Sequence, residues 1–156
     1  MADGVTFELP GGERVELRAL LVDFSGTLSL EGALIPGVGE RLRALCGKLR
    51  AVVLTADTFG KAREALRDLP VEMHFIATGR DKKIFVEELG PEHLAAVGNG
   101  RNDVDMIARA RVGIAVVGPE GASGPLVAAA DVVVRDINDA LDLLLHPLRL
   151  TATMRA

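Results

Sequence analysis

Residues 19–28 read ALLVDFSGTL, and this stretch decides the fold. Its first four residues are apolar, and Asp23 places a carboxylate where the apolar run ends. A short run of aliphatic residues is typical of a strand in a parallel sheet that helices cover on both faces. In such a sheet, ligands bind beyond the carboxyl ends of the strands. The stretch therefore predicts a buried strand with Asp23 at the ligand-binding edge of an α/β fold.

Extended and helical patterns alternate along the chain, which predicts further strands and helices. After residues 19–22, the predicted strands are 51–54, 71–76, 94–97, 113–117 and 131–134. The predicted helices are a segment that Pro36 opens and that continues to Leu49, followed by 58–69, 81–89, 103–110, 122–130 and 137–145. This alternation predicts a three-layer, Rossmann-like α/β fold with a doubly wound and mostly parallel sheet.

The ends of the chain add two smaller features to a single predicted domain, residues 1–156. Residues 5–9 and 14–17 flank the turn signal PGGE and predict a β-hairpin within residues 1–18. The tail, residues 147–156, is expected to be loosely ordered or to pack on a neighbour. No internal repeat or linker divides the chain.

Composition narrows the classes of function. A net charge of −4 argues against a nucleic-acid partner, and 3% aromatic residues with no Trp or Tyr leave few surfaces on which bases could stack. The single cysteine, Cys46, cannot form an internal disulfide and favours a reducing compartment. We find neither a signal-peptide pattern nor an apolar run of about 18 residues. We therefore expect a cytoplasmic protein with no membrane or nucleic-acid partner.

Polar side chains follow several of the predicted strands, at the edge where ligands bind. They are Asp23 with Ser25 and Thr27, then Thr55 with Asp57, then Asn99 with Asn102 and Asp103, and Lys82 lies at the start of a predicted helix. Carboxylate and amide oxygens suit magnesium, and an ammonium group offsets the charge of a phosphate. The set predicts a site for a divalent cation and a phosphoryl group.

Four segments resemble, in order, the four motifs of the haloacid dehalogenase (HAD) superfamily. They are DFSGTL at 23–28, VVLTAD at 52–57, RDKKIFVEELG at 80–90 and AAVGNGRNDVDM at 95–106. Within that superfamily they look most like the phosphorylation domain of P-type ATPases, with its DKTGTL, MLTGD and VGDGxNDxxAL patterns. The later VGIA and AADVVV segments fit the same likeness.

The resemblance implies a role for each matching residue. Asp23 would attack phosphorus and become an aspartyl phosphate. The phosphoryl group would be bound by Thr55, Ala56, Lys82 and Gly26. Mg²⁺ would be held by Asp23, the backbone carbonyl of Ser25, Asn99 and Asp103. Lys82 rather than Lys83 takes the lysine role, because the apolar Val86 and Leu89 follow it at the spacing of the family pattern.

Two positions depart from the family pattern. Ser25 stands where phosphatases of the family usually have a second aspartate as acid and base, a loss worth about 10²- to 10⁴-fold in rate. We therefore expect slow hydrolysis, least impaired for good leaving groups, and a Ser25→Asp variant that gains activity on poor ones. Asn99 replaces an aspartate, so we expect weaker magnesium binding.

The spacing of the motifs leaves no space for an inserted cap domain. The intervals from Asp23 to Thr55 and from Thr55 to Lys82 are already filled by the predicted helices and strands. We therefore expect no cap, no nucleotide-binding domain and no ATP-driven transport. A site without a cap is open to solvent unless another subunit covers it, which favours a homo-oligomer.

The sequence favours one function and leaves two others open. The favoured function is a Mg²⁺-dependent phosphohydrolase that acts on an unknown small phosphorylated substrate through an aspartyl phosphate. One alternative is a non-catalytic or regulatory module that binds phosphate or metal. The other is cleavage of a phosphorus–carbon or carbon–halogen bond. Residues 118–125 are expected to form a flexible connector, with a phosphate-facing loop as the alternative.

Overall fold

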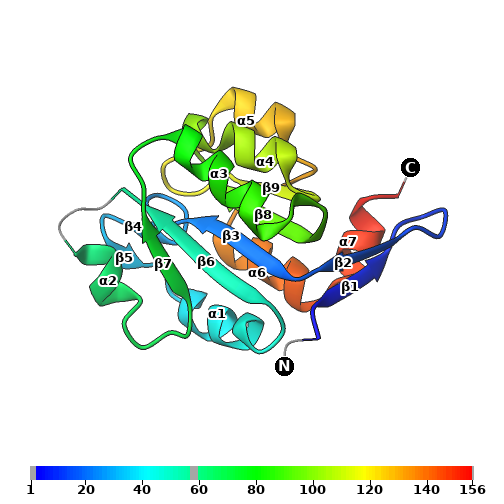
Figure 1. The fold of residues 1–156 in the computed structure, drawn as a ribbon, viewed down its shortest axis with the longest axis horizontal. Helices are drawn as coiled ribbons and strands as arrows, with labels where there is room; N and C mark the ends of the chain where they lie inside the picture. Colours follow the sequence, from blue (N-terminus) through cyan, green and yellow to red (C-terminus); the bar gives the residue numbers. More distant parts are fainter. Residues whose placement is uncertain (1–2, 57–59, 156) are drawn as a thin grey trace.

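A sheet of six strands, all parallel, forms the centre of the structure, a computed structural model that describes residues 3–56 and 60–155 (Figure 1). In spatial order the strands are β10 (Val132–Val134), β9 (Val112–Val116), β8 (Leu94–Gly98), β3 (Ala19–Asp23), β6 (Arg50–Thr55) and β7 (Glu72–Phe75). Each of these strands was predicted, and each boundary agrees to within one residue. The doubly wound α/β fold is therefore confirmed.

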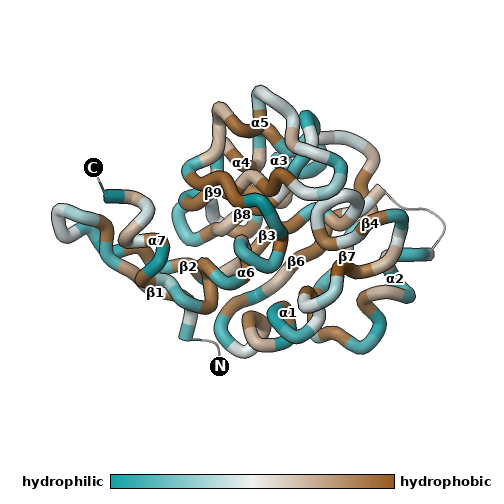
Figure 2. Tube along the Cα trace, turned by 180° about the vertical axis from the view of Figure 1, so that it is seen from behind, coloured by the Kyte–Doolittle hydropathy of each residue, from teal (hydrophilic) through white to brown (hydrophobic). Residues whose placement is uncertain are grey.

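Helices cover both faces of this sheet and enclose two hydrophobic clusters (Figure 1). One face carries α1 (Val38–Cys46), α2 (Lys61–Ala65) and α6 (Ile137–Leu145). The other face carries α3 (Gly79–Leu89), α4 (Val104–Arg109) and α5 (Gly124–Ala129). Two short 3₁₀ helices, η1 (Pro91–His93) and η2 (Arg101–Asp103), flank β8. Figure 2 shows that hydrophobic residues concentrate on the strands and on the inner sides of the helices, as two buried clusters require.

The position of β3 at the centre of the sheet explains where the site lies. All five residues of β3 are buried, and it pairs with β6 on one side and β8 on the other. Val22 lies level with Val53 and with Val97 in the register. The chain therefore leaves all three strands at one edge of the sheet, at a point where the strand order reverses, which is where such folds bind ligands.

A small hairpin, which the sequence did not reveal, follows β3. Its strands are β4 (Ser29–Leu30) and β5 (Ala33–Leu34), and the two turn residues, Glu31 and Gly32, both have positive φ. Two positive φ angles in a two-residue loop are typical of the tight turns that join antiparallel strands. Strands of two residues leave no periodic pattern from which they could be predicted. Among the described residues between Asp23 and Lys82, the chain forms this hairpin, α1, β6, α2, β7 and the start of α3.

The two ends of the chain pack against each other on the side of the molecule away from the β4–β5 hairpin (Figure 1). The predicted hairpin is present as β1 (Val5–Glu8) and β2 (Arg14–Leu17). The tail is not loosely ordered: it forms α7 (Leu148–Thr153), whose Leu150 is fully buried and whose Thr151 hydroxyl donates to the Glu8 carbonyl at 2.8 Å. That contact is between residues far apart in sequence, so local patterns could not predict it.

The helix predicted at 58–69 is shorter than expected. Residues 58 and 59 lie outside the described residues, and α2 begins after Gly60 and ends before Leu66, whose backbone leaves the helical region. Pro70 follows four residues later and cannot continue a helix, because it lacks the backbone N–H. Among the residues described, none of the helices has both the length and the apolar character needed to cross a bilayer.

The close approach of α4 to β9 yields a prediction about stability. A Cβ atom at Gly113 would lie 2.2 Å from the Ile107 carbonyl oxygen, so Gly113→Ala must move backbone and should cost about 2 to 3 kcal/mol. Gly124→Ala is the matched control, because a Cβ there meets nothing within 4 Å. Urea unfolding of both variants measures the difference. An equal loss of stability in the two variants would contradict the packing described.

Candidate active site

Residues that follow three neighbouring strands meet helix α3 at one edge of the sheet. Asp23 ends β3, Thr55 ends β6, Asn99 follows β8, and Lys82 lies in the first turn and a half of α3. A cavity of about 260 Å³ opens between them. Its lining consists of Asp23, Ser25, Ala56, Ile76, Ala77, Thr78, Lys82, Asn99, Gly100, Asn102 and Glu120. Thr55 is buried, and the next residue, Ala56, is part of the lining. Asp57 lies outside the described residues.

The ammonium group of Lys82 is the centre of this site. Its side chain is only 2% exposed, and Nζ donates to Asp23 Oδ1 at 3.1 Å and to Asp103 Oδ1. The start of α3 is fixed by a capping box, in which the Thr78 side chain accepts from the Asp81 backbone and the Asp81 carboxylate from the Thr78 backbone. Lys83, the alternative lysine, is exposed and lies on a different cavity.

Asp103 holds Lys82 and the loop after β8 together. It is fully buried, and while one oxygen accepts from Lys82, the other accepts from the backbone amides of Asn99 at 3.2 Å and Gly100 at 3.1 Å. Both oxygens of the predicted magnesium ligand Asp103 are therefore engaged by protein donors. This arrangement fits a carboxylate that positions the lysine.

A buried hydroxyl connects Asp23 to Asn99. Thr27 Oγ1 lies 3.2 Å from Asp23 Oδ2 and 3.1 Å from Asn99 Oδ1, so its single proton is donated to one of the two at a time. The amide nitrogen of Asn99 donates to the Gly121 carbonyl at 3.3 Å. The residues predicted at 23, 82, 99 and 103 are thus linked through hydrogen bonds, with Thr27 as the connecting group.

Burial and charge shift the pKa of both partners in the ion pair. Burial, followed by the negative charge of Asp103, raises the pKa of Asp23 to about 6 despite the opposing effect of Lys82. Burial alone would lower the pKa of Lys82, but the carboxylates of Asp23 and Asp103 outweigh it and raise that pKa. Lys82 is therefore charged at neutral pH, and Asp23 takes up a proton below about pH 6.

The oxygens that remain fit magnesium by their chemistry. The Asp23 carboxylate and the Asn99 amide oxygen lie close enough for one hydroxyl to reach both, and Ser25, whose carbonyl is the third predicted ligand, lines the same cavity. Hard oxygens of this kind suit Mg²⁺. Among the described residues, no three side chains of His, Cys, Asp or Glu gather as a metal site. The set offers one carboxylate, consistent with the weak affinity that Asn99 predicts.

A second cavity of about 390 Å³ adjoins the first and brings in residues that we did not predict. It is lined by Phe24, Ser25, Gly26, Ser29, Glu31, Gly32, Ala56, Lys61 and Glu120. Gly26, predicted to bind phosphate, lines this second cavity and not the first. Glu120 lines both cavities, and the sequence did carry a signal for it. It follows β9, so the rule that pointed to Asp23 and Asn99 also applies to Glu120.

A protein of known sequence is similar to part of this chain. No protein-family model matches this chain. An uncharacterised protein of Methanocaldococcus jannaschii is 49% identical over 74 residues, which cover 45% of this chain and 80% of the archaeal protein.

Solved structures resemble this chain over most of its length. A protein of Streptomyces avermitilis assigned to the HAD family of hydrolases superposes with a TM-score of 0.70 at 22% identity, covering 85% of this chain and 87% of its own. The cobalt-bound deoxy-D-mannose-octulosonate 8-phosphate phosphatase of Haemophilus influenzae gives a TM-score of 0.72 at 14% identity and coverage of 90% and 94%. The corresponding phosphatase of Moraxella catarrhalis, in complex with magnesium and phosphate ions, gives 0.66 at 16% identity and coverage of 87% and 90%. The chain therefore belongs to one family with the archaeal protein, and its fold is that of the haloacid dehalogenase superfamily.

Proposed function

We propose that this chain is a magnesium-dependent phosphohydrolase that acts on a small phosphorylated substrate through an aspartyl phosphate at Asp23. The observation that carries the proposal is the buried Lys82, held by Asp23 and Asp103 at the wall of a polar cavity. Two of the solved structures with this fold are described as phosphatases, and one of them contains magnesium and phosphate. The motif order in the sequence supports the same assignment.

The two halves of the reaction use the same three side chains. One oxygen of Asp23 attacks phosphorus, the bond from phosphorus to the leaving oxygen breaks, and the phosphoryl group is transferred to Asp23. Water then attacks the same phosphorus, which releases inorganic phosphate and restores the Asp23 carboxylate. Lys82 keeps a positive charge beside the transferring group in both steps, and Asp103 keeps Lys82 in place.

Magnesium would be held by Asp23, Asn99 and the Ser25 carbonyl, and when bound it would neutralise negative charge on the phosphoryl oxygens. Ser25 has no carboxyl group with which to protonate a leaving oxygen. We therefore propose slow turnover and a preference for good leaving groups. The sequence likeness to the phosphorylation domain of P-type ATPases stays part of this proposal, since that domain also has a hydroxyl residue at this place.

The remaining expectations from the sequence are proposals of the same kind. We propose a cytoplasmic protein that forms a homo-oligomer, in which a second subunit covers the site. Substrate selection then depends on the second cavity, with Lys61 and Glu31 in its wall, and on any subunit that covers it.

The first prediction concerns the nucleophile. Wild-type protein with Mg²⁺ should release phosphate from p-nitrophenyl phosphate or acetyl phosphate, and Asp23→Asn should reduce the rate about 10³-fold or more, because the attacking oxygen is lost. Asp139→Asn, the same change at an exposed position on α6, should leave the rate unchanged. Chelation of magnesium should abolish release from the wild type.

Two results would contradict the proposed hydrolase. Activity that survives Asp23→Asn would place the nucleophile elsewhere. Absence of turnover with every divalent metal, combined with magnesium-dependent binding of beryllium fluoride, would favour the non-catalytic module instead.

The second prediction concerns stability and pH. A shift in the pKa of Asp23 from 3.8 to about 6 corresponds to about 3 kcal/mol, and its sign means that the ionised carboxylate destabilises the folded state. In EDTA at about pH 8, Asp23→Asn should therefore be more stable than wild type by about 1 to 3 kcal/mol. The difference should shrink as the pH falls through about 6 and vanish only well below the ordinary pKa of 3.8, where Asp23 is protonated in both states.

Urea unfolding at several pH values measures this difference. A variant that is less stable than wild type at pH 8 would show that the ion pair with Lys82 outweighs burial and repulsion, contrary to the prediction.

A further inference from the structure

The two adjoining cavities share three residues, and these mark the place where a leaving oxygen would sit. Ser25, Ala56 and Glu120 line both the cavity that contains Asp23 and the larger cavity beside it. A phosphoryl group held at Asp23 would join its organic part across that boundary. Of the three shared residues, Glu120 is the one that carries a carboxyl group, which donates a proton when protonated and accepts one when ionised.

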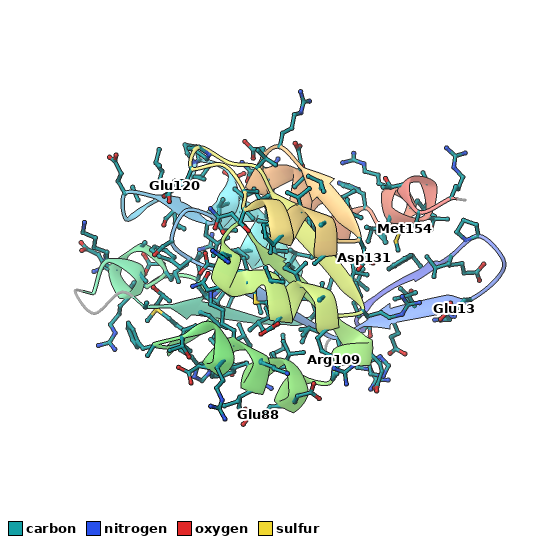
Figure 3. The ribbon with its side chains drawn as sticks, turned by 90° about the horizontal axis from the view of Figure 1, so that it is seen from above. Glu13, Glu88, Arg109, Glu120, Asp131 and Met154 are labelled. Carbon is teal, nitrogen blue, oxygen red and sulfur yellow. The ribbon has the colours of Figure 1, made fainter. Side chains whose placement is uncertain are left out.

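The carboxylate of Glu120 lies directly against the backbone of the loop after β3. Gly26 has a φ of +74°, and a Cβ built on it would lie 2.9 Å from Glu120 Oε1 and 3.0 Å from Oε2. Gly26 is the residue after Ser25, the position that lacks an acid. Figure 3 shows Glu120 at the end of the molecule opposite to Glu13 on the hairpin, among the loops at the carboxyl edge of the sheet.

Asn99 fixes the turn that carries Glu120. The Gly121 amide donates to the Gly118 carbonyl at 2.9 Å, which closes a tight turn around Glu120. Asn99 Nδ2 donates to the Gly121 carbonyl at 3.3 Å, and the Ser123 amide donates to the Asn99 carbonyl at 2.9 Å. An aspartate at position 99 could not make the bond to Gly121, because an ionised carboxylate has no proton to donate.

We propose that Glu120 is the general acid and base of this site and replaces the function that Ser25 lacks. The proposal rests on the phosphohydrolase proposed above. In the first step the Glu120 carboxyl group gives its proton to the leaving oxygen as the bond to phosphorus breaks, so that an alcohol departs and Glu120 becomes a carboxylate. In the second step Glu120 takes a proton from the water that attacks phospho-Asp23, which regenerates the acid.

The proposal connects the two departures from the family pattern. With serine at 25, the acid must come from another loop, and the amide at 99 holds that loop through its nitrogen. An exposed glutamate on a turn is held less firmly than a residue next to the nucleophile, so Glu120 provides only part of the rate that an aspartate at 25 would give. Slow turnover and the expected gain from Ser25→Asp are both compatible with this role.

The test compares Glu120→Gln with Glu88→Gln, the same change on an exposed part of α3 remote from both cavities. Phenyl phosphate needs a proton on its leaving oxygen, whereas 2,4-dinitrophenyl phosphate does not. Glu120→Gln should lower kcat/KM for phenyl phosphate about 30- to 100-fold and for the dinitrophenyl ester less than about 3-fold. With the dinitrophenyl ester it should also show a burst of dinitrophenolate, because loss of the base delays hydrolysis of phospho-Asp23.

A double-mutant cycle separates this role from a structural one. In the Ser25→Asp background, Glu120→Gln should change kcat/KM for phenyl phosphate less than about 3-fold, since Asp at 25 then supplies the proton. Glu120→Gln should still bind beryllium fluoride in the presence of Mg²⁺, measured by calorimetry. Equal losses on both esters, loss of beryllium fluoride binding, or no loss at all would overturn the role of Glu120.

Failure of the proposed function gives a different result. If wild-type protein shows no release from the dinitrophenyl ester that depends on Asp23, the phosphohydrolase itself is wrong, and the role of Glu120 falls with it. If that release is present and Glu120→Gln behaves like Glu88→Gln, only the inference about Glu120 is wrong.

Discussion

The account depends on one buried ammonium group, that of Lys82, which lies between the carboxylates of Asp23 and Asp103. Burial of three charges is costly, and the structure compensates with backbone donors to Asp103 and a hydroxyl donor to Asp23. Asp23 ends β3, Asp103 follows the neighbouring strand β8, and Lys82 lies on α3. The parallel sheet therefore brings the three groups together. The pKa of Asp23 is raised because its carboxylate is buried there beside Asp103.

Much of the fold could be predicted, because each sheet strand is a short apolar run between turn signals. The features that local patterns missed are those fixed by long-range contacts or by very short pairings, such as α7 and the β4–β5 hairpin. For the site, the strand-end rule led us to Asp23 and Asn99, and the spacing of the family pattern that the sequence resembles separated Lys82 from Lys83. Their catalytic roles stay predictions. Glu120 also follows a strand, β9, but we missed it because we interpreted residues 118–125 as a connector.

Loss of the usual acid at position 25 does not by itself mean loss of chemistry. The sequence shows Ser25 and Asn99 as two independent departures, each of which weakens the expected activity. The structure relates them through the side chain of Asn99. Its oxygen contacts Thr27, in the loop after Asp23, and its nitrogen contacts the turn that carries Glu120. An amide can do both, since it accepts at one atom and donates at the other.

The most direct measurement for the central claim is the chemical identity of the intermediate. Wild-type protein would be mixed with acetyl phosphate and Mg²⁺, quenched in acid within the first turnovers, digested and sequenced by mass spectrometry. The account predicts a peptide that carries one phosphoryl group, with the added mass on Asp23. Continued release of phosphate with no modification of Asp23, or with the phosphoryl group on another residue, would contradict the account.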